Sequence, residues 1–346
     1  MKSSSYDVMI LGGGIAGLGV AIPLARAGKK VLVIEKKLKG RSTPAAGGIL
    51  DPFLDMRPGH PLLPLGLKAF REYPARIRAL ARRTQVDVGY KKTGMFYAAF
   101  NRAEQMELKK REAWQKKTGI PVRWRSAKQI LKREPALEKN ILGGLDYPAI
   151  ARIQPKKLLQ ALERDARLAG VHFGASPRPS SITVNATGSW AGLQRALPIL
   201  PIKGQIEIIR SGLKIKTILH TVNGGYIVPW GSGSYLLGST VEFAGYDAKV
   251  TTKGLQEIRK RTEKLVPGIR SAKTVETWSG LRPYSKTGLP LIGPASKRGH
   301  YLACGFYRSG ILIGMTAGEL LAKSILTGKT PKMLKPFEPG NHVPKN

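Results

Sequence analysis

The residues from Tyr6 to Glu35 constrain the fold more than any other part of the chain. They form, in order, an apolar run, a glycine-rich turn, a helical stretch stopped by Gly28 and a second apolar run that ends in an acid. The turn carries three glycines in the spacing GxGxxG, which are Gly12, Gly14 and Gly17. This order predicts a strand–helix–strand unit of the kind that binds dinucleotides.

Each glycine has a separate role in such a unit. Gly12 permits the tight turn, Gly14 lets a pyrophosphate approach the backbone, and Gly17 lets the helix pack against the strand. The pyrophosphate would lie at the helix N-terminus, where free N–H groups and the helix dipole favour negative charge. Glu35 would accept hydrogen bonds from a ribose hydroxyl.

The segment after this unit contains only small residues from Ser42 to Gly48. Larger side chains there would collide with a large flat ligand, so this composition favours backbone lying against one. Three further motifs stand near the C-terminus: WSGLRP at 278–283, GLPLIG at 288–293 and GFYRSGIL at 305–312.

With these motifs the chain resembles the FAD-dependent D-amino acid oxidase family over about residues 6–328, and the C-terminal motifs look most like glycine oxidase. The resemblance implies an α/β fold, in which a Rossmann-type FAD-binding domain is interleaved with a mixed-sheet α+β substrate domain. The chain shows no convincing His or Cys tether, which favours non-covalent FAD. The residues expected at the cofactor are Gly12, Gly14, Ile15, Ala16, Gly17, Glu35, Lys36, Ser42, Ala45, Ala46, Gly47, Gly48, Ile49, Gly305, Arg308, Ser309, Gly310, Ile311 and Leu312.

The resemblance also implies roles at the substrate. Arg282 matches the family's carboxylate-binding arginine, and a planar guanidinium is the best bidentate partner for a carboxylate. Tyr226 matches a tyrosine whose hydroxyl helps hold the same carboxylate. Arg308 lies where relatives place a basic residue beside the flavin or the substrate entrance. Val241 matches an apolar position in the substrate wall.

The domain division follows from the order of the expected elements. The FAD-binding domain is expected at 1–85, 151–197 and 276–332, the substrate domain at 86–150 and 198–275, and a basic tail at 333–346. Residues 199–240 alternate apolar and polar, which predicts the antiparallel sheet of the substrate domain. The stretch 171–182 is shorter than in relatives, which leaves the adenine contacts open.

Apolar spacing predicts helices at 64–83, 103–117, 126–133, 155–169, 251–265 and 312–326, and a strand at 91–100. Pro74 is expected to break the first helix. The proline- and lysine-rich end from Lys329 offers little to fold on and is expected to lie on the surface or fray.

Charge is the unusual feature of the composition. The chain has 58 Lys and Arg against 22 Asp and Glu, a net charge of +36. Such an excess is typical either of solvated helix faces in a proteome of biased composition or of proteins that attract nucleic acid or an anionic membrane. Five histidines without ligand spacing and a single cysteine, Cys304, predict no metal site and no internal disulfide.

Three functions remain open on the sequence. The first is oxidation of the C–N bond of a small amino acid or N-substituted glycine, by an oxidase or a dehydrogenase. The second is tRNA modification, because the FAD domain of the enzyme that processes the wobble-uridine carboxymethylaminomethyl group belongs to the same superfamily. The third is a membrane-surface D-amino acid dehydrogenase. The lone cysteine and the lack of an apolar run near 20 residues predict a cytoplasmic protein without a transmembrane segment. The oligomeric state is left open.

Overall fold

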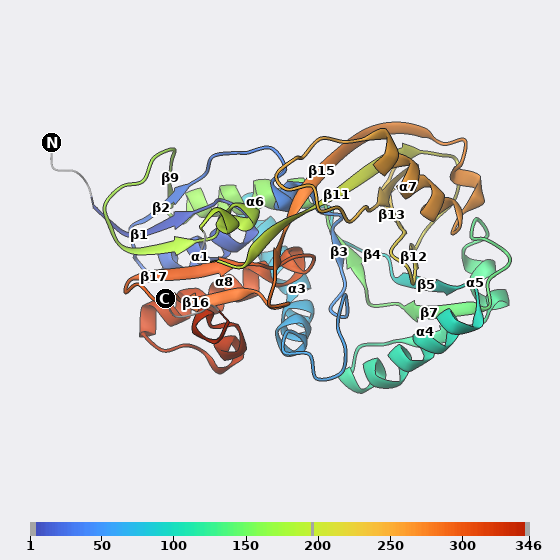
Figure 1. The fold of residues 1–346 in the computed structure, drawn as a ribbon, viewed down its shortest axis with the longest axis horizontal. Coiled ribbons are helices and arrows are strands. Elements are labelled where there is room, and N and C mark those ends of the chain that lie inside the picture. The colour runs from blue at the N-terminus through green and yellow to red at the C-terminus, as the bar shows by residue number, and fades with distance from the viewer. Residues whose placement is uncertain (1–4, 195–196, 343–346) are drawn as a thin grey trace.

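Two large β-sheets lie in opposite halves of the molecule, as the computed structural model in Figure 1 shows. The structure describes residues 5–194 and 197–342. Segments from both ends of the chain build the half that carries the termini, while the middle of the chain builds most of the other. The interleaved α/β architecture expected from the sequence is therefore confirmed.

The sheet beside the termini has the order β16-β17-β10-β1-β2-β9. All neighbouring strands are parallel except β16, which pairs antiparallel with β17 at one edge. This confirms the predicted parallel strand–helix–strand unit. The bounds are β1 Tyr6–Leu11, β2 Val31–Ile34, β9 His172–Gly174, β10 Ser180–Asn185, β16 Leu291–Pro294 and β17 His300–Cys304.

Four helices pack in this half: α1 Ile15–Arg26, α3 Leu63–Thr84, α6 Pro155–Leu168 and α8 Gly310–Thr327. Glycines let α1 and α8 approach until their backbones meet: a Cβ on Gly19 would lie 2.8 Å from the carbonyl oxygen of Gly314. By length and hydropathy α8 could cross a membrane, but 61% of that window is buried inside the protein. Its packing against α1 is that of a core helix.

The helix α3 continues through Pro74, so the expected break is wrong. A proline inside a helix removes one hydrogen bond and costs about 3 kcal/mol or more. Here the apolar face of α3 is buried in the core, at Leu65, Ala69, Tyr73, Ile77 and Leu80. Burial of such side chains stabilises the fold by about 1.5–3 kcal/mol each, which outweighs the cost of one proline.

The second sheet has the order β15-β11-β14-β13-β12-β5-β7-β6. Its neighbours are antiparallel, as expected for 199–240, except that β12 and β5 run parallel. The bounds are β5 Met95–Ala99, β6 Arg123–Arg125, β7 Gly143–Tyr147, β11 Ile199–Arg210, β12 Ile218–Thr221, β13 Tyr226–Gly231, β14 Ser234–Gly238 and β15 Lys273–Ser285.

Helices cover the two faces of this sheet. Successive side chains of a strand point to opposite faces, so neighbouring residues pack against different helices. On one face α4 (Arg102–Gln115) packs with Met95, Tyr97 and Tyr226; on the other, α5 (Ala127–Arg133) and α7 (Thr252–Glu263) pack with residues such as Phe96 and Ile227. The remaining elements are short: α2 Ser42–Ala45, the three-stranded sheet β3 Ile49–Leu50, β8 Ala151–Arg152 and β4 Lys91–Lys92, and the 3-10 helices η1 Lys116–Thr118, η2 Gly188–Leu193, η3 Pro267–Ile269, η4 Lys332–Phe337 and η5 Pro339–Asn341.

Two of the proposed domain boundaries fall inside elements. The boundary at 276 lies within β15, which pairs with β11 along almost its whole length, and the boundary at 333 lies within η4. The tail was expected to find little to fold on, and this is wrong for η4. Leu334 and Phe337 are fully buried in the core of the FAD-binding half, because the tail carries apolar residues between its lysines.

This burial predicts that the tail stabilises the fold. Phe337→Ala should lower the free energy of unfolding by about 3–5 kcal/mol, the usual effect of emptying a core phenylalanine site. Denaturant unfolding measures it, with the exposed Lys335→Ala in the same 3-10 helix as control. Equal stability of Phe337→Ala and the wild type would show that η4 is not docked in solution.

Candidate active site

A cavity of about 480 Å³ lies between the two halves. The β1–α1 turn and the 41–51 segment line one side, and strands of the eight-stranded sheet line the other. One wall of the cavity is therefore the predicted nucleotide site, and the other wall is formed by side chains of the eight-stranded sheet.

The β1–α1 turn supplies the nucleotide wall. Gly12 has a φ of +105°, and a Cβ there would lie 2.3 Å from the carbonyl oxygen of Ala186, so only glycine fits. At Gly14 a Cβ would meet one atom, Oγ1 of Thr43, at 3.1 Å, and the residue lines the cavity. A side chain at Gly14 would therefore occupy space at the start of α1, where the first N–H groups have no partner within the helix.

Glu35 stands at the end of β2 and lines the same wall. Its Oε2 accepts a hydrogen bond of 2.6 Å from the N–H of Gly13, and its Oε1 accepts one of 2.8 Å from the N–H of Lys37. The guanidinium of Arg41 lies 3.5 Å from Oε1. The carboxylate is thus held in place beside the turn, where a ribose hydroxyl can reach its remaining acceptor capacity.

Most of the residues expected at the cofactor line this cavity. They are Gly12, Gly14, Ile15, Ala16, Glu35, Lys36, Ser42, Ala45, Ala46, Gly47, Gly48, Ile49, Arg308, Gly310 and Ile311. Four others do not line it: Gly17, Gly305, Ser309 and Leu312. A Cβ on Gly17 would lie 1.9 Å from the carbonyl oxygen of Gly12, so this glycine serves helix packing instead. Ser309 donates its hydroxyl to the carbonyl of Phe306, and Leu312 is buried in the core.

Three aromatic rings form a row on the sheet wall. Tyr97 on β5, His220 on β12 and Tyr226 on β13 stand on neighbouring strands, with centroid distances of 4.4 Å and then 5.5 Å. Burial lowers the pKa of His220 to about 3, so its imidazole is neutral at physiological pH. The sequence analysis found no ligand spacing among the histidines and missed that His220 lines the cavity.

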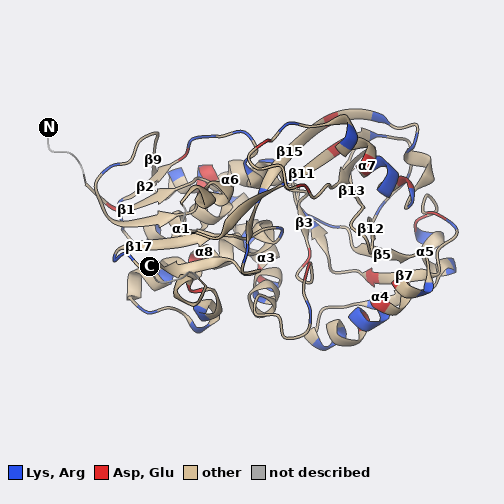
Figure 2. Cartoon of the chain, in the orientation of Figure 1, with Lys and Arg blue, Asp and Glu red and all other residues tan. Residues whose placement is uncertain are grey.

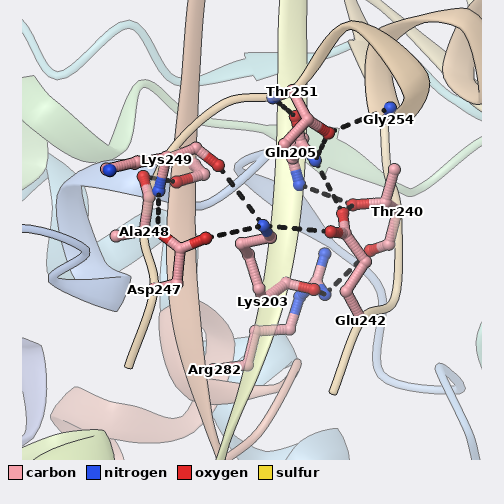
Figure 3. Close-up of polar contacts among 11 residues, drawn as sticks. Lys203, Gln205, Thr240, Glu242, Asp247, Ala248, Lys249, Thr251, Gly254 and Arg282 are labelled. Atoms are coloured by element: carbon pink, nitrogen blue, oxygen red, sulfur yellow. Dashed lines mark hydrogen bonds and ion pairs between the residues drawn. The ribbon is translucent and has the colours of Figure 1, made fainter. Parts of the chain in front are cut away.

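Arg282 enters the cavity from β15, as Figure 3 shows. Nη1 donates to the carbonyl oxygen of Thr240 at 3.0 Å, and Nη2 donates to Oγ of Ser239 at 2.8 Å. The guanidinium lies over Gly204, where a Cβ would come within 2.1 Å of Nη2. Burial lowers the pKa of Arg282. The pairing of β11 with β15 thus places Arg282 beside Gly204, and the absence of a side chain at Gly204 leaves room for the guanidinium.

The charge of Arg282 has no counter-ion among residues 5–194 and 197–342. Among the described residues no carboxylate lies within 4 Å of its guanidinium. The two nearby acids in Figure 3, Glu242 and Asp247, bind the ammonium of Lys203 instead, at 3.1 and 3.7 Å. A buried cation without a partner is unfavourable, so the arrangement calls for an anionic ligand in the cavity.

Arg308 lies at the edge of the cavity beside the 51–62 loop. Its Nη1 donates to Oδ1 of Asp55 at 2.8 Å. This ion pair joins the start of α8 to a loop more than 250 positions earlier in the chain. Arg308 therefore lies at the cavity wall, as expected, but with its charge shared by an acid.

Asp51 is an acidic residue of the cavity that sequence reasoning missed. It is buried, and its Oδ1 accepts a hydrogen bond of 2.8 Å from the N–H of Phe53. Burial raises the pKa of Asp51 from its ordinary value of 3.8 to about 6. The sequence offered one signal: an acid three residues after the small-residue segment, directly after the apolar pair Ile49 and Leu50.

Val241 does not contribute to the wall. It is 49% exposed and does not line the cavity, so its expected role is wrong. It follows Thr240, whose backbone carbonyl accepts a hydrogen bond from Arg282. Ser239 takes the place beside the guanidinium instead.

A glycine turn at a helix N-terminus, an acid at the end of the next strand and a cavity with a free cation define the class of dinucleotide-binding oxidoreductases. A model of the FAD dependent oxidoreductase family, DAO, matches residues 7–324. The chain therefore belongs to this family, its cofactor is FAD, and the resemblance seen in the sequence is confirmed.

Individual relatives match the chain from end to end. It is 30% identical to glycine oxidase of Geobacillus kaustophilus over 369 residues, with 98% of both chains covered. Glycine oxidase of Pseudomonas putida is 28% identical, with 94% of this chain and 96% of that protein covered. The crystal structure of the Geobacillus kaustophilus enzyme superposes with a TM-score of 0.92, at 29% identity and with 98% and 100% of the two chains covered.

A Cβ on Gly14 would meet only Oγ1 of Thr43, so we predict that a side chain at this position prevents cofactor binding but leaves the fold intact. Gly14→Val should purify folded but without the yellow flavin spectrum, because its methyl groups occupy the approach to the α1 N-terminus. The control is Gly212→Ala, at a glycine whose added Cβ would meet nothing within 4 Å. Full flavin content in Gly14→Val would contradict the assignment of this wall.

The pKa of Asp51 predicts a pH-dependent gain in stability on removal of its charge. The native state holds this proton more tightly than the unfolded state, so wild-type stability falls as pH rises from 3.8 to 6. Asp51→Asn should be more stable than the wild type above pH 6, by roughly 3 kcal/mol, and the difference should vanish below pH 4.

Denaturant unfolding of the holoprotein at pH 4 and pH 7.5 measures this difference. Asp87→Asn is a matched control, because Asp87 also accepts the N–H two residues on, at 2.8 Å, but is exposed. No gain in Asp51→Asn at pH 7.5 would mean that Asp51 is solvated in the native state.

Proposed function

We propose that this FAD-dependent oxidoreductase oxidises the C–N bond of a small amino acid or an N-substituted glycine. The observation that carries the proposal is the buried guanidinium of Arg282, which lines the cavity without a counter-ion among the described residues. The near-full-length similarity to glycine oxidases supports the same substrate class.

The substrate carboxylate would bind between Arg282 and Tyr226. Two donors of Arg282 are fixed by Thr240 and Ser239, which orients the fork before a ligand arrives. The hydroxyl of Tyr226 points to the 45–49 segment, since a Cβ on Gly47 would lie 2.8 Å from its oxygen. The carboxylate would thus be held against the segment expected to contact the cofactor.

When bound, FAD supplies the electron acceptor that takes a hydride from the carbon beside the amine. The protein supplies position and surroundings. Arg282 and Tyr226 fix one end of the substrate, and the rings of Tyr97 and His220 cover the sheet wall and exclude water. Orientation of this kind provides a large part of the acceleration, and an amine that binds neutral needs no general base.

The tRNA-modifying alternative is not favoured by the relatives, whose names are those of glycine oxidases. Basic residues are spread over both halves of the molecule in Figure 2, on helices and on loops. This spread supports the interpretation of the charge as solvated surface. We also propose a cytoplasmic location, which the fully buried lone thiol of Cys304 supports, since it needs no oxidising compartment.

Loss of the guanidinium of Arg282 should weaken substrate oxidation without loss of bound flavin. Arg282→Ala should keep the flavin spectrum but lose about two to three decades in kcat/KM, because a desolvated charge-assisted pair contributes ~2–4 kcal/mol. Arg282→Lys should recover part of this, since an ammonium keeps the charge without the fork. Flavin reduction by glycine, sarcosine and D-alanine measures it, with the exposed Arg298→Ala as control. Wild-type rates in Arg282→Ala would place the carboxylate elsewhere.

A further inference from the structure

The sheet wall of the cavity has two chemically different ends. The guanidinium of Arg282 lies over Gly204 of β11, and the row then passes through Tyr226 on β13 and His220 on β12 to Tyr97 on β5. Neighbouring strands are about 4.8 Å apart, so the row is long compared with glycine itself. Space therefore remains beyond a glycine carboxylate held at Arg282.

Asp51 stands at the other end of this row. Its turn partner Phe53 packs on Tyr147 of β7, the strand beyond β5, with ring centroids 6.1 Å apart. The charge of Asp51 contributes, after burial, to raising the pKa of both Tyr97 and Tyr147. Asp51 thus lies near the β5 end of the row, and the guanidinium of Arg282 lies beyond its β13 end.

The second oxygen of Asp51 is available to a ligand. Oδ1 is used by the N–H of Phe53, and among the described residues no donor lies within hydrogen-bond distance of Oδ2. The nearby cations have other partners: Arg308 binds Asp55 at 2.8 Å, and Arg111 binds Glu107 at 3.0 Å. A buried carboxylate that lines a cavity without a cationic partner is a binding group for a cation or a strong donor.

We propose that Asp51 is the subsite for a second ammonium group, so that the preferred substrates are amino acids or N-substituted glycines with a cation at the end remote from the carboxylate. The inference rests on the function proposed above and names the substrate class of the same site. Glycine would occupy only the Arg282 end. An ammonium at the other end would pair with Oδ2 in a water-poor space, where such a pair is strong.

The test compares N-(ω-aminoalkyl)glycines of two to four methylenes with N-alkylglycines of equal length, in which a methyl group replaces the ammonium. Anaerobic flavin reduction at pH 8 is the readout, because it does not depend on whether oxygen is the acceptor. The wild type should prefer the cationic member at one or more lengths by about 10- to 100-fold in the second-order rate of reduction, as for a hydrogen bond to a charged group.

Asp51→Asn, and independently Asp51→Ser, should abolish this preference. Asp55→Asn is the matched control, since Asp55 lies four residues along the same loop but pairs with Arg308 and does not line the cavity. It should keep the preference, although its rates change. Iminodiacetate has a carboxylate at the remote end and should reduce the wild-type flavin more slowly than the neutral members. In Asp51→Asn the difference between these rates should become smaller.

Two results would overturn the inference and remain distinguishable. If glycine and sarcosine reduce the flavin but cationic and neutral members react equally, or if Asp51→Asn keeps the preference, the Asp51 subsite is wrong and the proposed function stands. If no amine of the series, glycine and sarcosine included, reduces the wild-type flavin, the proposed function fails and the inference falls with it.

Discussion

The pairing of β11 with β15 is the constraint on which the site depends. Along this ladder Ile202 stands opposite Arg282 and Gly204 opposite Gly280, which lays the guanidinium over a residue without a side chain. The same strand is tied to the FAD-binding half, because Oγ of Ser189 donates to the carbonyl oxygen of Leu281. The strand β15 thus belongs to the eight-stranded sheet and also contacts the half that carries the β1–α1 turn.

Two buried acids outside the site, Asp146 and Asp165, are compensated by arginines, whereas the fully buried Glu134 has no cation within 4 Å among the described residues. Asp146 is fully buried and is bound by Arg123, Arg125 and Arg133, with the last at 2.8 Å. Asp165 is bound in the same way by Arg26 and Arg83. In a chain with more than twice as many basic as acidic residues, a buried acid has many possible partners. Asp51 also has no cation within 4 Å among the described residues, and unlike Glu134 it lines the cavity, where a ligand can reach it.

Local patterns predicted the parts of the site that are contiguous in sequence. The GxGxxG spacing gave the β1–α1 turn, and the WSGLRP motif gave Arg282. Tyr226 was expected at the substrate from its match to the family, but its row with Tyr97 and His220 could not be predicted from a local pattern, because the row is created by strand order. The parallel pairing of β5 with β12 joins residues more than 120 positions apart, and no period within either strand records it.

The same limit explains two of the wrong predictions, those for Pro74 and for the tail. The penalty of Pro74 is local, whereas the burial that outweighs it comes from α6 and α8, far along the chain. The lysines of the tail predicted solvent exposure, whereas Leu334 and Phe337 find a core that closes only after both ends of the chain meet. Local signals failed wherever the decisive partner was remote in sequence.

The overall charge and the cavity act on substrates at different ranges. A field from 58 basic and 22 acidic residues attracts carboxylates from solution and repels cations, and salt screens it within about 10 Å. Attraction at long range therefore favours any anion and cannot select a second ammonium. Such selection has to arise by contact inside the cavity, where solvent no longer screens and where Asp51 is a buried acid on the wall formed by the 41–51 segment. The long-range field thus favours the carboxylate end of a substrate, and specificity for the other end depends on a single buried oxygen.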